Sequence, residues 1–158
     1  MEAAIQRNYS IVLEIPRILF AWMSEKNVGT ASNGEQANGS KKMPAWDREE
    51  VVLLVSEYFR TCNMPRSDID SSVEFISKTL RRRAKRNGMT IGPRYRNIAG
   101  IQMKFGNIQS LDQERQKEGY SGLKNVSALE KSVVEEYYTC PEKINQEAYF
   151  VIMKYARL

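Results

Sequence analysis

The stretch "WDREEVVLLVSEYFR", residues 46–60, decides the predicted fold of this chain. Its apolar side chains recur at the spacing of one face of an α-helix: Val51, Leu54, Val55 and Tyr58. Asp47 stands just before this run as a predicted N-cap, and the glutamates that follow suit the positive end of the helix dipole. The stretch therefore predicts a helix that buries one face.

The same periodicity predicts two more helices downstream. The second spans roughly residues 68–87 and ends in a basic run before Asn87-Gly88, a pair that commonly stops a helix. Asn97 is predicted to cap the third helix. The apolar stripe of that helix consists of Ile98, Ile101, Phe105 and Ile108.

Two C-terminal helices complete the pattern. Ser127 and Glu130 have the spacing of a capping box, and Pro141 suits the first turn of a last helix. No hairpin dipeptide separates alternating apolar runs, so strands are not expected. The predicted fold class is all-α, a small helical bundle with a flexible N-terminal extension. The methionines are expected to fill the core or the helix ends.

The N-terminal quarter differs in composition from the rest. Residues 1–26 form an apolar segment, but Glu14, Pro16 and Arg17 interrupt it, so it predicts neither a membrane span nor a signal peptide. Residues 27–42 are rich in Gly, Ser, Asn and Gln and read as a linker. The predicted helical, DNA-binding-like domain therefore covers residues 43–158.

Composition excludes several classes of function. The chain has 158 residues and no histidine, and it shows no nucleophile–base pair, phosphate-binding loop or metal cluster. The adjacent pairs Glu49-Glu50 and Glu135-Glu136 are interpreted as solvated helix surface. Cys62 and Cys140 are expected to be reduced thiols of a cytoplasmic protein. We therefore predict no enzyme activity, no metal and no cofactor.

Charge gives the clearest functional signal. Between residues 78 and 104 there are nine cations and no acidic residue, whereas the whole chain carries a net charge of +5, so the remainder carries −4. The cations are Lys78, Arg81, Arg82, Arg83, Lys85, Arg86, Arg94, Arg96 and Lys104. A local cluster of this kind indicates a polyanionic partner, with duplex DNA as the first candidate. A solvated helix end and an anionic membrane surface are the alternatives, although the run lacks an apolar insertion face.

Residues 94–100 leave several interpretations open. Tyr95 is either a ring that anchors the loop in the core, which is favoured, or a ring that stacks on a base. Asn97 is either a helix cap, again favoured, or an adenine contact. Arg96 is interpreted as a phosphate or guanine ligand, with a buried salt bridge as the alternative. Gly100, one turn into the third helix, is expected to permit close approach of another backbone.

Four motifs together resemble the N-terminal module that precedes the nuclease domain in HNH-type restriction endonucleases. They read "WDREEVVLLVSEYFR", "ISKTLRRR", "YRNIAGIQMKFGNIQSLD" and "GYSGLKNVS". The positions that match the pattern most specifically are Arg96, Asn97, Gly100, Lys104, Asn107 and Asp112. Tyr95 and Ile108 stand where the pattern has Phe.

The resemblance implies DNA binding without cleavage, because the HNH motif and its histidines are missing. It also implies a restriction or defence role of prokaryotic type, on DNA that is modified or unmodified. Whether the chain acts alone, is a shortened nuclease or serves a separate nuclease subunit stays open, as does its oligomeric state.

The resulting prediction is a DNA-binding module in which the nine cations, Tyr95 and Asn97 form the interface. The alternative is a regulatory helical module that docks on a partner enzyme through residues 1–26, whose apolar side chains would mark a contact surface.

Overall fold

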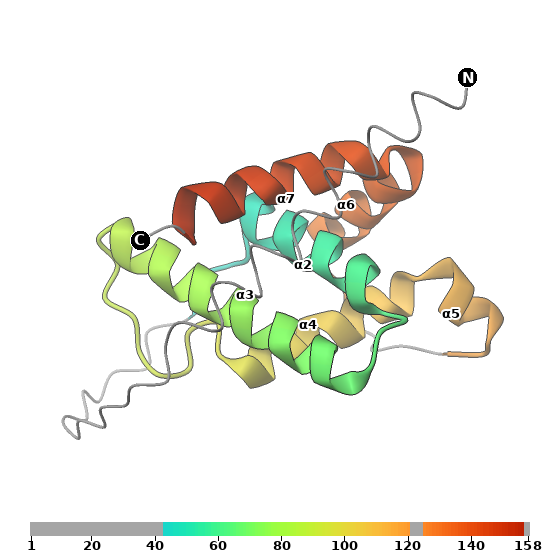
Figure 1. Ribbon diagram of the computed structural model, residues 1–158, viewed down its shortest axis with the longest axis horizontal. Coiled ribbons are helices and arrows are strands. Elements are labelled where there is room, and N and C mark those ends of the chain that lie inside the picture. Colours follow the sequence, from blue (N-terminus) through green and yellow to red (C-terminus); the bar gives the residue numbers. More distant parts are fainter. Residues whose placement is uncertain (1–42, 121–124, 157–158) are drawn as a thin grey trace. The chain divides into compact units, whose positions relative to one another are not determined.

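The computed structural model describes residues 43–120 and 125–156, and the helices of these residues are labelled α2 to α7 in Figure 1. They are α2 (Arg48–Thr61), α3 (Arg66–Arg86), α4 (Ile98–Leu111), α5 (Gln113–Lys117), α6 (Ala128–Thr139) and α7 (Pro141–Tyr155). Within these ranges no strand is present, so the predicted all-α class is confirmed. The predicted apolar segment 1–26 and linker 27–42 lie outside the described residues.

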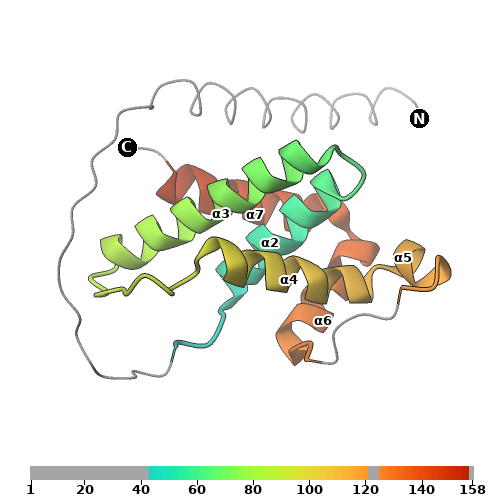
Figure 2. The ribbon, with the colours of Figure 1, turned by 90° about the horizontal axis from the view of Figure 1, so that it is seen from below.

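Helix α2 is the centre of the bundle. It packs against α3, α4, α6 and α7, and both Figure 1 and Figure 2 show it between its neighbours. The five consecutive residues from Val51 to Val55 are all buried. Five consecutive residues of a helix point in all directions around its axis, so along this stretch α2 is enclosed by other elements. The opening stretch therefore buries more than the single predicted face.

Side-chain caps define where three of the helices begin, as predicted. The Asp47 carboxylate accepts a hydrogen bond from the Glu50 N–H at 3.1 Å. In turn the Glu50 carboxylate accepts one from the Asp47 N–H, also at 3.1 Å. Ser127 and Glu130 form the same reciprocal box at the start of α6. The Asn97 side chain accepts the N–H of Gly100 at 2.9 Å and starts α4. The predicted first-turn proline, Pro141, opens α7.

The structure departs from the sequence prediction at several places. Helix α3 begins at Arg66, two residues earlier than predicted, and the short helix α5 was not predicted. Ile98 was placed in the buried stripe of α4, but it is 48% exposed. Four of the methionines expected in the core or at the helix ends are exposed and therefore not in the core: Met43, Met64, Met89 and Met103. None of the described helices has the length and apolar character needed to cross a bilayer.

Candidate nucleic-acid interface

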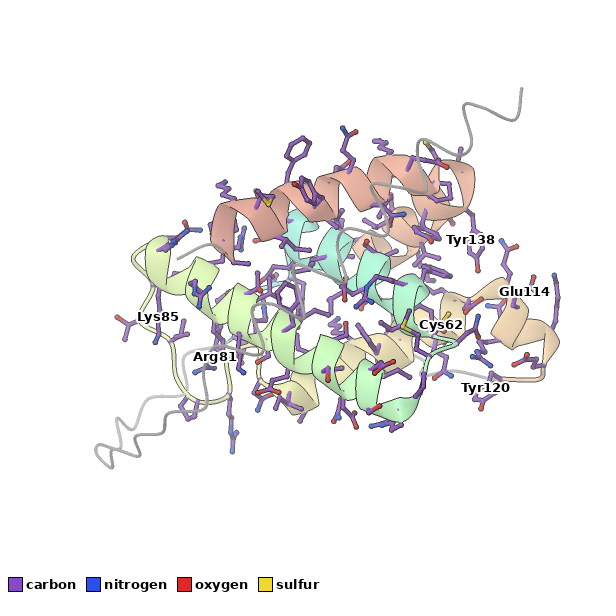
Figure 3. All side chains as sticks on the ribbon, in the orientation of Figure 1. Cys62, Arg81, Lys85, Glu114, Tyr120 and Tyr138 are labelled. Carbon is purple, nitrogen blue, oxygen red and sulfur yellow. The ribbon has the colours of Figure 1, made fainter. Side chains whose placement is uncertain are left out.

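Six of the nine predicted cations gather at one end of the bundle. This basic end consists of Lys78, Arg81, Arg82, Lys85, Arg86 and Arg94, which lie in the C-terminal half of α3 and the loop that follows it. Lys78, Lys85, Arg86 and Arg94 are exposed, and Arg81 and Arg82 are half-buried. Figure 3 shows Arg81 and Lys85 near the end of the domain opposite to Glu114 and Tyr120.

Arg81 holds the loop between α3 and α4 in place. Its Nη1 donates hydrogen bonds to the carbonyl oxygens of Gly92 and Pro93 at 3.2 and 3.3 Å, and to that of Tyr95. From the preceding turn of α3, the Ser77 hydroxyl donates to the carbonyl of Arg96 at 2.7 Å. These bonds fix the backbone on both sides of Arg94. They therefore determine where the exposed Arg94 side chain leaves the backbone.

Arg82 and Arg86 cap the end of α7. Their Nη1 atoms donate to the carbonyl oxygens of Ala156 and Lys154, each at 2.7 Å. The last carbonyls of a helix lack intrahelical partners and carry the negative end of its dipole, so guanidinium groups stabilise them. Arg82 and Arg86 therefore stabilise the end of α7 as well as contributing charge to the basic end. Both side chains are still partly accessible at the surface of the domain.

Arg83, on the same helix, is matched by carboxylates. Its guanidinium lies 2.8 Å from Asp47 Oδ2 and 2.8 Å from Glu49 Oε2, and its side chain is only 13% exposed. Burial disfavours the charge, but the hydrogen bonds to Glu49 and Asp47 outweigh it and raise the pKa of Arg83 above its ordinary value. Arg83, which the sequence predicted as a phosphate contact, thus ties α3 to the start of α2.

Arg96 is buried in the interior of the bundle, where it forms an ion pair with Glu50. Its Nε and Nη2 bond the two carboxylate oxygens of Glu50 at 2.8 and 2.7 Å. Nη2 also donates to the carbonyl oxygens of Ala45 and Pro44, at 2.9 and 3.2 Å. The guanidinium carbon lies 3.9 Å from the centre of the Trp46 ring, a cation–π contact. The buried salt bridge left open by the sequence is therefore what the structure shows.

The backbone at Arg96 is unusual because its φ angle is +43°, in the left-handed region that non-glycine residues rarely adopt. Such a backbone conformation is locally unfavourable, so it persists only where contacts with the surrounding structure hold it in place. Here the ion pair holds the side chain, and the Ser77 hydrogen bond holds the carbonyl.

Tyr95 and Lys104 are also interior residues. The Tyr95 hydroxyl donates to Glu50 Oε1 at 3.3 Å, and burial followed by the negative charge of Glu50 raises the pKa of Tyr95. The Lys104 ammonium lies 3.0 Å from Glu130 Oε1 and 5.3 Å from the centre of the Trp46 ring. The Trp46 ring thus makes cation–π contacts with two buried cations, Arg96 and Lys104. Neither Tyr95 nor Lys104 is accessible to a nucleic acid in this structure.

Glu130 is the second fully buried carboxylate of this polar interior. Burial opposes its ionisation, but hydrogen bonds from the backbone and hydroxyl of Ser127 and the ion pair with Lys104 hold the pKa of Glu130 below its ordinary value. The Asn107 amide donates to Glu130 Oε1 and to the carbonyl of Asn125, each at 3.4 Å. No buried polar side-chain atom among the described residues lacks a partner.

The remaining signature positions serve helix ends. Asn97 is a cap, and a Cβ added at Gly100 would lie 3.2 Å from Asn97 Oδ1, so glycine leaves room for the capping side chain. Among the described residues no backbone of another element comes within 4 Å of that Cβ position. Asp112 caps α5 by accepting the N–H of Glu114 at 3.0 Å. It also accepts the hydroxyls of Tyr58 and Tyr138, at 2.9 and 3.1 Å.

The structure thus separates the predicted interface into two sets. The basic end is on the surface, whereas Arg83, Tyr95, Arg96, Asn97 and Lys104 are engaged in holding helices together. Sequence reasoning missed the acidic partners, because Glu50 was interpreted as solvated surface and Glu130 only as a capping residue. The signal that could have found them is the presence of Arg96 and Lys104 next to the apolar stripe of α4, because a cation buried there needs a matching anion.

No cluster of three or more potential metal ligands occurs among the described residues. Comparison of the chain with protein families, with curated proteins and with solved structures found no match.

Proposed function

We propose that this domain binds duplex DNA through its basic end and does not cleave it. The observation that carries the proposal is the grouping of exposed cations on the last turns of α3 and the loop before α4, in a window of sequence without acidic residues. Neutralising backbone phosphates releases condensed counterions, which favours binding of such a surface to any duplex.

Lys85 and Arg94 are the residues to which we assign direct phosphate contacts. Both are exposed, and within the described part of the chain neither forms an ion pair. Lys78 is also exposed, but its ammonium lies 2.6 Å from Glu74 Oε1. Its contribution is smaller because part of its charge is already matched.

The resemblance to the N-terminal module of HNH restriction endonucleases supports the same function. Of the arrangements that the resemblance leaves open, we propose the one in which this chain supplies DNA affinity and a separate nuclease supplies cleavage. In this proposal the signature residues build the domain, and the less distinctive exposed cations contact the DNA.

The test is a fluorescence-anisotropy titration of a labelled duplex at several salt concentrations. Lys85→Ala/Arg94→Ala should weaken binding and reduce the slope of log K against log salt by about 2, since each phosphate contact contributes roughly 0.9. The matched control is Lys117→Ala/Lys131→Ala, which removes two exposed charges from α5 and α6. It should leave the slope nearly unchanged. Absence of binding at low salt to any duplex, modified or not, would contradict the proposal, as would equal losses in the two variants.

A further inference from the structure

The outer face of α4 is free of charge, in contrast to the basic end beside it. The one charged residue of this helix, Lys104, is buried against Glu130. Ile98 and Met103 are 48% and 58% exposed, and Ala99 and Gln102 are exposed between them. An exposed helix surface normally carries charged residues, so this face differs from a face that only meets water.

This uncharged face adjoins the basic end. Arg94 lies four residues before Ile98, the first residue of α4, and the Arg81 and Ser77 hydrogen bonds tie the intervening backbone to α3. Figure 2 shows α3 and α4 side by side, joined by the loop at the end where α4 begins. A duplex whose phosphates contact Lys85 and Arg94 would therefore also meet the first turns of α4.

We propose that the outer face of α4 reads base-pair edges in the major groove; this inference rests on the DNA binding proposed above. An α-helix fits that groove, a glutamine amide can bond adenine at two atoms, and apolar side chains contact the methyl group of thymine. Gln102 supplies the amide, and Ile98 and Met103 supply the apolar contacts. On its exposed side α4 itself carries neither a carboxylate that would repel phosphates nor a cation that would bind them at any sequence. The nearest charges at Gln102 belong to α3, where Asp70 and Arg66 line the same hollow.

The division between the two surfaces follows general recognition physics. Phosphate contacts position a protein on the duplex, and contacts with base edges specify where it binds. The basic end would supply affinity and salt dependence, whereas α4 would supply sequence preference. The two contributions can therefore be separated by experiment.

The experiment selects bound duplexes from a library with a randomised central segment, using the full 158-residue chain. We expect the wild type to enrich a motif that contains A·T pairs. Gln102→Ala/Met103→Ala should bind the enriched duplex about ten-fold or more weakly, at the level of unselected DNA, with an unchanged salt slope. The matched control is Gln146→Ala/Phe150→Ala, which removes one amide and one apolar side chain from the exposed part of α7. It should keep the wild-type motif and affinity.

Four results would overturn the inference, and they have different meanings. If the wild type binds the library but enriches no motif, α4 does not read sequence, and the proposed DNA binding still stands. If the variant keeps the motif, sequence is read elsewhere. If the variant alters only the oligomeric state in light scattering, the face is a protein interface. Failure of the wild type to bind any duplex would remove the proposed function together with the inference.

Discussion

Two arginines only two residues apart, Arg94 and Arg96, should respond to the same substitution in opposite ways. Arg94 is exposed, whereas Arg96 is buried and bonds both oxygens of Glu50. We expect Arg96→Ala to lower the free energy of unfolding strongly. Arg94→Ala should change that free energy by less than about 0.5 kcal/mol, as is usual for surface substitutions, and should weaken DNA binding instead.

The size of the Arg96 effect follows from what Glu50 would lose. Glu50 is 1% exposed, and breaking a buried ion pair by removing one partner costs about 3–5 kcal/mol. Three groups would still contact its carboxylate: the Asp47 N–H at 3.1 Å, the Tyr95 hydroxyl at 3.3 Å and Arg83 Nη1 at 3.9 Å. Because these contacts soften the loss, we expect about 3–4 kcal/mol for Arg96→Ala.

Backbone conformation gives a second, independent expectation at the same position. With φ at +43°, any residue with a Cβ is strained there, and the left-handed conformation costs about 1 kcal/mol or slightly more. Arg96→Gly should therefore be destabilised by roughly 1 kcal/mol less than Arg96→Ala, although both lose the same ion pair.

Urea unfolding followed by helical circular dichroism would measure all three variants. The midpoint should fall for the two Arg96 variants while the slope with denaturant stays constant, because the surface exposed on unfolding is similar. The reasoning would be refuted by an Arg96→Ala loss below about 1 kcal/mol, the value of a surface pair. Equal midpoints for Arg96→Ala and Arg96→Gly would remove the argument from backbone strain.

The other predictions concern helix caps and pH. Asn97→Ala should cost about 1 kcal/mol, the usual value of an N-cap. Gly100→Ala should be close to neutral in the wild type but stabilising by roughly 0.5–1 kcal/mol once Asn97 is Ala, because its Cβ then no longer crowds Oδ1; a double-mutant cycle checks the coupling. The bonds from Arg48, followed by those from Lys143, hold the pKa of Glu136 at about 2, below its ordinary 4.5. Its stabilisation is complete above pH 4.5 and is lost as the pH falls toward 2, so Glu136→Gln should flatten the acid limb of stability measured by thermal melts across this range.

The sequence was sufficient to predict the helical class and most helix starts, because these depend on local chemistry. Asp47, Asn97 and Ser127 cap helices through backbone groups three residues away, and periodicity places the apolar faces. The enclosure of α2 along residues 51–55 was harder to predict, since "VVLLV" does not say how many neighbours surround it. Helix α5 was missed because five residues are too few for periodicity, so only the Asp112 cap marked it.

The candidate site was harder to predict than the fold, because charge alone does not distinguish an interior cation from a surface one. Arg96 is paired with a residue 46 positions earlier, and Lys104 with one 26 positions later. Only the folded bundle shows that these pairs exist. Arg48 illustrates the same limit, because its partners Glu136 and Glu147 lie on α6 and α7.

This partition of the cations sets an upper limit on the electrostatics of DNA binding by the basic window. Nine phosphate contacts would predict a slope of log K against log salt near −8, at roughly 0.9 for each contact. Arg83, Arg96 and Lys104 are neutralised inside the domain by carboxylates, so at most six cations of the window remain for phosphates. The slope should then be no steeper than about −5. A steeper measured slope would mean that cations outside residues 78–104 also contact the duplex, and a slope near zero would mean that the basic end does not bind it. Salt dependence therefore tests, in one measurement, how many of the nine cations can serve the ligand.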